Sequence, residues 1–260
     1  MTDLGALSFP SARALLAEGA VGLLPVGATE AHGPHLPLDT DVRIATATAA
    51  RAAPRIAEVL GLEAVVLPPI AYSVTEYAAP FAGTIGVPAE AARAYLGEVL
   101  KSAARQGFRA LCAVNAHLEP AHRHVLRDAV KAARRTAACP VTIADPCDRR
   151  FVDRLTDELR SGKCHAGQYE TSILLAAGVP VDRGAMRALP EVDVDLVAGM
   201  QAGLSTFPEM GANEAYFGTP AAATAAEGHD TLNRLAQIVV EVLSEGLNDP
   251  TLKEPTESSR

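Results

Sequence analysis

The chain contains no tryptophan, and aromatic residues make up only 4% of its 260 residues. Cysteine is also scarce, and none of the four cysteines forms a C-x-x-C pair: Cys112, Cys139, Cys147 and Cys164. We expect no secretory leader, because the first twenty residues lack its apolar core. We therefore expect reduced thiols in a cytoplasmic protein rather than a framework of disulfides.

Long hydrophobic runs are missing as well. Pro10, Arg13 and Glu18 interrupt the apolar positions of the first twenty residues, whereas a membrane span needs roughly 20 apolar residues. The formal net charge is −8, which argues against nucleic acid or an anionic membrane as a partner, because both favour clustered Lys and Arg. We expect a small molecule as the substrate.

Short apolar segments alternate along the chain with segments of helical periodicity. Strands are predicted at 21–26, 64–68, 109–114 and 141–144, and helices at 11–18, 40–60 with a kink or break at Pro54, 88–103, 121–133, 170–177 and from Asp230 onward. This alternation predicts an α/β fold with a mostly parallel sheet that is covered on both faces. No linker divides the chain, so a single domain is expected over residues 1–247, followed by a flexible tail at 248–260.

The first polar segment follows the predicted strand 21–26 and contains Glu30, His32 and Asp41. Alternate residues of a loop can project the same way, and Pro34 and Pro37 can fix the path that brings Asp41 back. Mixed carboxylate and imidazole ligands suit zinc or manganese, and one aspartate can bridge two ions. The spacing permits a metal site.

The second polar segment places His117 and Glu119 two residues apart, directly after another predicted strand. If the two strands are parallel, both loops lie at the same edge of the sheet. Together they supply enough ligand atoms for two ions that share Asp41. Two metal ions roughly 3.5–4 Å apart can generate hydroxide near neutral pH and polarise a carbonyl oxygen.

The third polar segment places His165 and Glu170 around the start of a predicted helix. A histidine suits proton transfer to a leaving nitrogen. Glu170 could bind metal, orient His165, or favour the positive end of the helix. Cys164 could suggest a thiol nucleophile, but two adjacent residues do not face each other as a nucleophile and its base must.

The remaining histidines have simpler interpretations. His229 is expected to be a surface or capping residue, and His122 and His124 are expected to be solvated at the charged start of a helix. His35 stands between two prolines and is expected to hold its loop together.

The segment 24–41, LPVGATEAHGPHLPLDTD, closely resembles the opening signature of the creatininase family of metal-dependent amidohydrolases. Four further segments resemble motifs of that family, in the same order along the chain: 81–85 (FAGTI), 115–117 (NAH), 165–172 (HAGQYETS) and 217–224 (FGTPAAAT). The resemblance covers roughly residues 20 to 230.

The resemblance implies a three-layer α/β/α fold and a centre of two divalent ions, Zn²⁺ or Mn²⁺. It further implies two ligand sets that share one carboxylate: Glu30, Asp41 and His117 for one ion, and His32, Asp41 and Glu119 for the other. A hydroxide activated by the metal would attack a carbonyl carbon, and His165 would carry the proton to the leaving atom. Ser73 and Leu118 are expected to contact the substrate, and family members are usually homo-oligomers, often hexamers.

Two departures from the family pattern limit this inference. The chain has no tryptophan, whereas creatininase surrounds the flat ring of creatinine with tryptophan indoles. Creatinine is therefore an unexpected substrate. Pro120 replaces a polar residue of the family motif, so Glu170 is the substitute ligand if Glu119 turns away.

The leading hypothesis is hydrolysis of a C–N bond in a small polar amide, cyclic or a formamide. The same centre could also hydrolyse a sugar-derived carbonyl compound or a peptide bond. A catalytically silent metal-binding protein is the alternative from another class. The sequence leaves open the substrate, the identity of each metal and the oligomeric state.

Overall fold

The computed structural model describes residues 2–252 and is built around a five-stranded sheet. The strands are β1 (Thr2–Asp3), β2 (Val21–Val26), β3 (Ala64–Val66), β4 (Leu111–Asn115) and β5 (Val141–Ala144). They lie in the order β1-β3-β2-β4-β5, and every pair is parallel. The predicted parallel sheet is therefore confirmed. The edge strand β1 was not predicted, because two residues are too short to show a pattern.

The central strands are apolar throughout because both faces of the sheet are buried. In β2, Val21 and Leu23 belong to one hydrophobic cluster, whereas Leu24 and Val26 belong to another. Successive side chains of a strand point to opposite faces, so one continuous apolar run supplies two separate cores.

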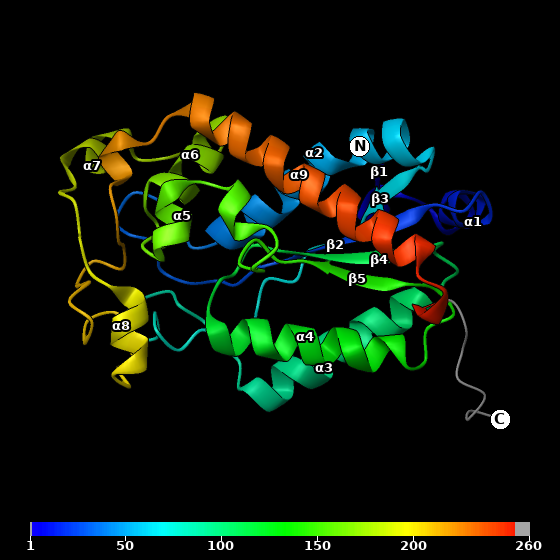
Figure 1. Ribbon diagram of the computed structural model, residues 1–260, viewed down its shortest axis with the longest axis horizontal. Helices are drawn as coiled ribbons and strands as arrows, with labels where there is room; N and C mark the ends of the chain where they lie inside the picture. Colours follow the sequence, from blue (N-terminus) through cyan, green and yellow to red (C-terminus); the bar gives the residue numbers. More distant parts are fainter. Residues whose placement is uncertain (1, 253–260) are drawn as a thin grey trace.

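Helices cover each face and complete three layers (Figure 1). The first core packs against α2 (Thr40–Leu60), α6 (Gln168–Ala176) and α9 (Ala225–Asn248). The second core packs against α3 (Ala89–Ala104) and α4 (Pro120–Arg134). The predicted three-layer α/β/α arrangement is confirmed.

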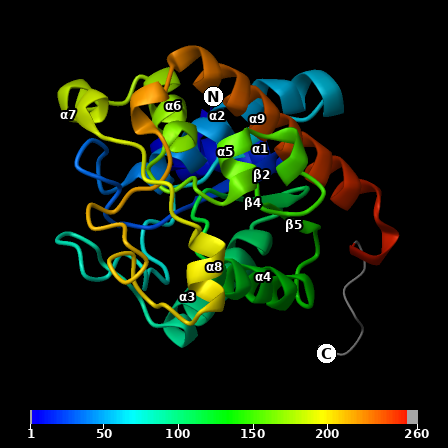
Figure 2. The same cartoon turned by 60° about the vertical axis from the view of Figure 1, so that its left-hand side comes forward.

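The shorter elements lie outside these layers. They are α1 (Phe9–Ala17), α5 (Asp157–Ser161), α7 (Arg183–Ala188), α8 (Leu196–Gln201) and the 3-10 turns η1 (Leu4–Ala6), η2 (Val152–Arg154), η3 (Pro220–Ala222) and η4 (Pro250–Leu252). Turning the molecule brings α5, α7 and α8 forward among long loops (Figure 2). This loop-rich end carries the candidate site.

Three helix predictions need correction. Pro54 does not break α2, which runs from Thr40 to Leu60 with Pro54 on its exposed side, whereas the kink stays a prediction. Asp230 does not cap the last helix, which begins at Ala225 with the Thr224 side chain accepting from the Glu227 amide. Asn248 belongs to that helix rather than to the tail, and residues 253–260 lie outside the described part.

Two further features follow from the described residues, 2–252. The four cysteines form no disulfide there. None of the helices in that range has the length and apolar character needed to cross a membrane.

Candidate metal centre and active site

The candidate site lies where β2 and β4 end. Val26 pairs with Asn115 across the two parallel strands, so the loops that leave them begin side by side. The loop after β2 carries Glu30 and His32, and the loop after β4 carries His117. This edge of an α/β sheet is the usual place for a ligand site.

The loop after β2 doubles back before it enters α2. The Glu30 amide donates to the Leu38 carbonyl oxygen at 2.9 Å, and the Thr40 hydroxyl donates to the Pro37 carbonyl oxygen at 2.6 Å. Asp41 thus falls in the first turn of α2, where the helix dipole favours a carboxylate. The return path brings Asp41, which is 1% exposed, next to the end of β2.

Gly27 makes this close approach possible. A Cβ atom at position 27 would lie 2.6 Å from the Val42 nitrogen and 2.8 Å from the Asp41 Cβ. We expect Gly27→Ala to lower the free energy of unfolding by about 1–3 kcal/mol, because the start of α2 must move. Chemical denaturation measures this. Gly97→Ala is the matched control, since its Cβ meets nothing within 4 Å inside α3, and a loss of stability as large as that of Gly27→Ala would contradict the explanation.

Asp41 lies between two buried imidazoles. Its Oδ1 atom is 3.2 Å from His32 Nε2, and its Oδ2 atom is 3.0 Å from His117 Nδ1. The same His117 nitrogen lies 3.4 Å from Glu30 Oε1. The four side chains are almost fully buried, so they form one closely coupled group of charges.

Both imidazoles use their other nitrogen to bind the backbone. His32 Nδ1 donates to the Glu30 carbonyl oxygen at 3.1 Å, and His117 Nε2 donates to the Val74 carbonyl oxygen at 2.7 Å. A carbonyl oxygen only accepts, so these nitrogens carry the protons and the neutral rings turn lone pairs toward Asp41. Histidines that ligate metal are oriented in this way. A lone pair facing a carboxylate requires a cation or a proton between them.

The pKa values of the group also indicate that positive charge is favoured between these side chains. Burial acts to lower the pKa of His32, but Asp41 and the neighbouring carboxylates outweigh it and raise the pKa to about 10. Burial acts to raise the pKa of Asp41, but His32 and His117 hold it well below its usual value. These directions fit a site that requires positive charge, which a divalent ion would supply.

Glu170 completes the group from another element. It lies in the first turn of α6, and its Oε2 atom is 3.5 Å from His32 Nε2 and accepts from the Ala166 amide at 2.7 Å. Burial, with Asp41 and Glu30 nearby, raises the pKa of Glu170 to about 8 despite the opposing effect of His32.

His165 lies on the open side of the group. Its Nε2 atom donates to the Ala31 carbonyl oxygen at 2.9 Å, and its Nδ1 atom is 3.7 Å from Glu30 Oε1. Its ring centroid is 4.4 Å from that of His32 and 4.5 Å from that of Phe207. Burial and the nearby His32 lower the pKa of His165 to about 4. The ring therefore has one anchored nitrogen and one nitrogen that faces the carboxylates.

The side chains fit divalent cations. Three sets have ligand atoms within 4.8 Å of one another: Glu30, Asp41 and His117; His32, Asp41 and Glu170; and Glu30, His32 and His165. Two of their buried atoms, His32 Nε2 and Asp41 Oδ2, have no hydrogen-bond partner among the described residues. Carboxylate and imidazole donors of this kind suit zinc and manganese.

Three other predicted site residues lie around this group. Glu119 lines the cavity, and backbone amides bind its carboxylate: both oxygens accept from the Glu76 amide, at 2.9 and 3.2 Å, and one also accepts from the Tyr77 amide. Ser73 is fully buried, and its hydroxyl lies 2.6 Å from His122 Nδ1. Leu118 lines the cavity beside the group.

The prediction that His122 is solvated is wrong, since this residue is 0% exposed. Burial lowers the pKa of His122 well below its usual value. The sequence held a usable signal, because His122 shares a helical face with Val125, Leu126 and Ala129. His124 is exposed, as predicted, and His229 is exposed as well.

His35 is buried, and its Nε2 atom lies 2.9 Å from the Thr171 hydroxyl oxygen. The contact ties the loop after β2 to α6, which agrees with a role in holding the loop.

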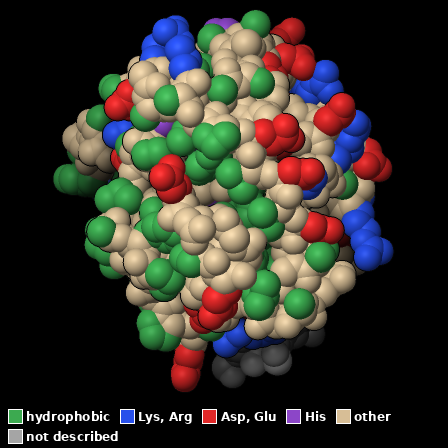
Figure 3. All heavy atoms as spheres, turned by 90° about the vertical axis from the view of Figure 1, so that its left-hand side faces the viewer, with side chains coloured by type: hydrophobic (Ala, Val, Ile, Leu, Met, Phe, Trp, Pro, Cys, Tyr) green, Lys and Arg blue, Asp and Glu red, His purple; other side chains and the backbone are tan. Residues whose placement is uncertain are grey.

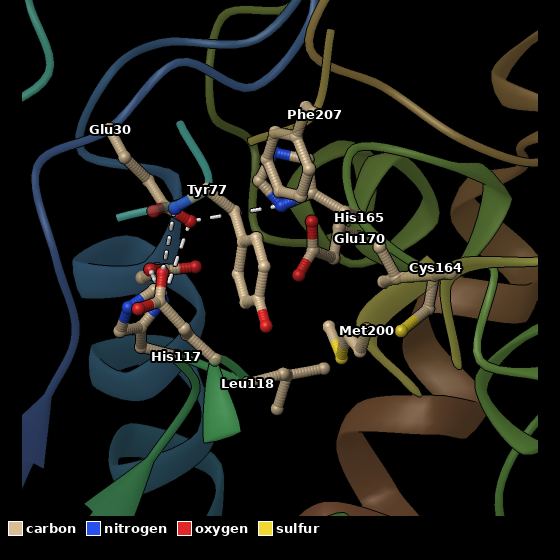
Figure 4. Close-up of a pocket in the computed structure, with 12 residues that line it drawn as sticks. Glu30, Tyr77, His117, Leu118, Cys164, His165, Glu170, Met200 and Phe207 are labelled. Atoms are coloured by element: carbon tan, nitrogen blue, oxygen red, sulfur yellow. Dashed lines mark hydrogen bonds and ion pairs between the residues drawn. The ribbon is translucent and has the colours of Figure 1, made fainter. Parts of the chain in front are cut away.

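A cavity opens beside the carboxylates and imidazoles, with about 410 Å³ of empty space including its mouth. Figure 4 shows side chains from several elements pointing into this shared space. Leu118 lines this cavity together with four residues that the sequence analysis did not find: Tyr77, Leu196, Met200 and Phe207. These four belong to loops or to the short helix α8, where no periodicity marks them.

The outer surface at this end has the same kinds of side chain as the cavity, hydrophobic and acidic. Figure 3 shows hydrophobic side chains over the middle of the face, acidic side chains among them, and lysine and arginine toward the margins. Within the described part of the chain, no lysine or arginine lines the cavity.

A parallel α/β/α fold with a buried carboxylate and imidazole group at the ends of its strands defines a class of hydrolase-like proteins. The sequence model of the family described as "Creatininase: Creatinine amidohydrolase" matches residues 5–243. The chain belongs to the creatininase family and is a hydrolase of that family. The predicted family is confirmed.

Among similar proteins is the mycofactocin precursor peptide peptidase of Mycobacterium ulcerans (strain Agy99), 37% identical over 213 residues that cover 79% of this chain and 77% of that protein. The protein of the same name from Mycobacterium tuberculosis (strain ATCC 25618 / H37Rv) is 37% identical over 217 residues, with the same coverage of 79% and 77%. The creatinine amidohydrolase of Pseudomonas putida is 31% identical over 122 residues, or 45% of each chain.

Solved structures share the fold. A structure of creatinine amidohydrolase (creatininase) aligns with a TM-score of 0.73 at 23% identity, covering 95% of this chain and 98% of that one. A second structure, "Creatininase Mn", aligns with a TM-score of 0.72 at 22% identity, covering 95% and 99%.

Proposed function

We propose that this chain is a metal-dependent hydrolase that cleaves a peptide bond. The observation that carries metal dependence is the position of Asp41 between two imidazole lone pairs, with no hydrogen-bond partner for His32 Nε2 or Asp41 Oδ2 within residues 2–252. The peptide substrate is supported by the relatives named as peptide peptidases, which match most of the chain, whereas the creatinine amidohydrolase matches less than half of it.

In this proposal, two sets of ligands share Asp41: Glu30, Asp41 and His117 for one ion, and His32, Asp41 and Glu170 for the other. Glu170 takes the place that the resemblance implied for Glu119, because backbone amides hold the Glu119 carboxylate. When bound, two divalent ions such as Zn²⁺ or Mn²⁺ supply Lewis acidity, which lowers the pKa of water and polarises a carbonyl.

The other residues of the cavity bind the substrate and transfer a proton to its leaving nitrogen. His165 keeps its Nε2 proton on the Ala31 carbonyl oxygen, so Nδ1 can accept a proton and pass it to the departing amide nitrogen. Phe207 packs against the His165 ring and keeps water from that side. Leu118 and the other apolar wall residues accept an uncharged part of the peptide.

The cavity also favours some peptides over others. Four carboxylates line it, at Glu30, Asp41, Glu119 and Glu170, and no lysine or arginine of residues 2–252 does. We expect a peptide with an apolar residue beside the scissile bond to be cleaved faster than the same peptide with an acidic residue there. Competition assays with paired peptides measure the ratio of kcat/KM.

Metal analysis tests the proposal directly. Purified protein is expected to contain about two equivalents of zinc or manganese, measured by mass spectrometry of the metals. A chelator should abolish peptide cleavage, and either metal should restore it. A folded protein with metal content near zero that still cleaves peptides would contradict the proposed centre. Turnover of cyclic amides, lactams or formamides without peptide cleavage would favour the other hypothesis, in which the substrate is a small amide.

We also propose that residues 2–247 act as one domain, since the first core draws on residues from Val21 to Leu243. A homo-oligomer, a hexamer by family resemblance, is proposed as the working form. Analytical ultracentrifugation measures the oligomeric state.

A further inference from the structure

The segment 73–77 contacts the proposed metal ligands at several points. Its Val74 carbonyl oxygen accepts from His117 Nε2 at 2.7 Å, and its Thr75 hydroxyl donates to the Glu30 carboxylate. Its amides at Glu76 and Tyr77 bind Glu119, which is not one of the proposed ligands. The orientation of His117 and Glu30 therefore depends on where the segment lies.

Regular secondary structure does not hold this segment in place. Residues 71–76 belong to no helix or strand. The Val87 amide donates to the Ser73 carbonyl oxygen at 2.9 Å, and side chains supply further contacts that fix the segment. Ser73 begins the segment, and its hydroxyl lies 2.6 Å from His122 Nδ1. His122 projects from the first turns of α4, on the buried face of that helix. One imidazole thus joins the segment to a rigid element.

The other nitrogen of His122 binds the end of β4. His122 Nε2 lies 2.9 Å from Asn115 Oδ1. The backbone fixes the Asn115 amide, because Nδ2 donates to the His117 carbonyl oxygen at 2.9 Å and Oδ1 accepts from the His117 amide at 3.2 Å. Since Oδ1 only accepts, His122 Nε2 carries its proton, and Nδ1 of the neutral ring accepts from the Ser73 hydroxyl.

These three side chains have the composition of a nucleophilic triad, with Ser73 as the hydroxyl, His122 as the base and Asn115 as the orienting group. Burial excludes that role. Ser73 and His122 are both 0% exposed, and neither is among the residues that line the cavity. A nucleophile that no substrate can reach does not act in catalysis.

We infer that His122 is a positioning residue, which holds the segment 73–77 so that Val74 and Thr75 orient His117 and Glu30 for metal binding. The inference rests on the proposed function, because it assigns the ligands that are oriented. The His117 ring also lies against the His122 ring, with centroids 4.7 Å apart, so His122 supports its neighbour both by packing and through the segment. Groups that orient metal ligands typically change metal affinity 10–100-fold when they are removed.

The test compares His122→Phe, which keeps a ring without nitrogens, with the wild type. We expect metal affinity, measured by competition with a chromogenic chelator, to fall about 10–100-fold. Excess metal should restore part of kcat. Recovery of kcat with excess metal is the readout that separates positioning from a purely structural role, because added metal does not repair a fold that has lost stability. His124→Phe is the matched control on the same helix, because His124 is 73% exposed and should change none of these values.

Two further variants keep the inference testable if His122→Phe fails to fold. Ser73→Ala removes only one hydrogen bond and should weaken metal binding in the same direction. His122→Gln keeps a donor for Asn115 and should recover part of the affinity.

Unchanged metal affinity in a folded His122→Phe or Ser73→Ala variant would overturn the positioning role. Loss of turnover in Ser73→Ala with metal affinity intact would overturn it in favour of a nucleophile. A wild type that binds no metal would instead refute the proposed function, so the two failures are distinguishable.

Discussion

Asp41→Asn is expected to lose both metal ions and to lower kcat/KM by about a thousandfold or more. The carboxylate is the only group shared by the two proposed ligand sets, and asparagine offers one oxygen and no charge in its place. Lewis-acid stabilisation of a transition state is worth several kcal/mol, and each 1.36 kcal/mol is a factor of ten in rate. Metal analysis and steady-state kinetics on the same preparation measure the two losses together.

The control for this substitution is Asp39→Asn, two residues earlier. Asp39 is partly exposed and pairs with Arg43 across one turn of α2, so its loss should change stability by less than about 1 kcal/mol and leave metal content unchanged. Retention of two metal ions in Asp41→Asn would show that the shared carboxylate is not a ligand. Loss of metal in Asp39→Asn would point to a general effect on the start of α2.

The layers of the fold could be predicted because burial leaves a local signature in the sequence. The strands 21–26 and 141–144 were predicted with the bounds that β2 and β5 have, since short uncharged runs suit strands that are buried on both faces. The start of α9 was missed. Its first turns are exposed and alanine-rich, so Thr224 gives no periodic signal there and Asp230 resembles a cap.

The centre of the candidate site was also predictable. Glu30, His32 and His117 follow strands that run parallel and lie next to each other, so sequence position alone brings them to one edge of the sheet. Asp41 requires the loop to double back, which Pro34 and Pro37 made plausible; the close approach at Gly27 became visible only in the structure.

The surroundings of the site were not predictable, because they depend on contacts between distant segments. The amides of Glu76 and Tyr77 bind the Glu119 carboxylate, and nothing in the 117–119 spacing indicates this. The position of Glu170 near His32 depends on how α6 packs against α2. The apolar wall comes from residues such as Phe207, whose burial arises only from tertiary packing.

His165→Ala is expected to leave the metal content unchanged and to lower kcat by about 10²–10⁴-fold, the usual contribution of a positioned proton donor. His165 is anchored through Nε2 to Ala31, which leaves Nδ1 at the cavity side of the carboxylates. If it acts on the leaving nitrogen, its loss affects a step after substrate binding, so KM should change little. His229→Ala, at an exposed position, is the matched control.

The same variant decides between two roles that the geometry allows. His165 Nδ1 lies 3.7 Å from Glu30 Oε1, and His165 also forms a possible ligand set with Glu30 and His32. A ligand and a proton carrier differ in what their removal does first. Loss of one equivalent of metal in His165→Ala, with activity recovered by excess metal, would make His165 a ligand. Full metal content with lost turnover would assign it to proton transfer, because metal binding would then not need the ring.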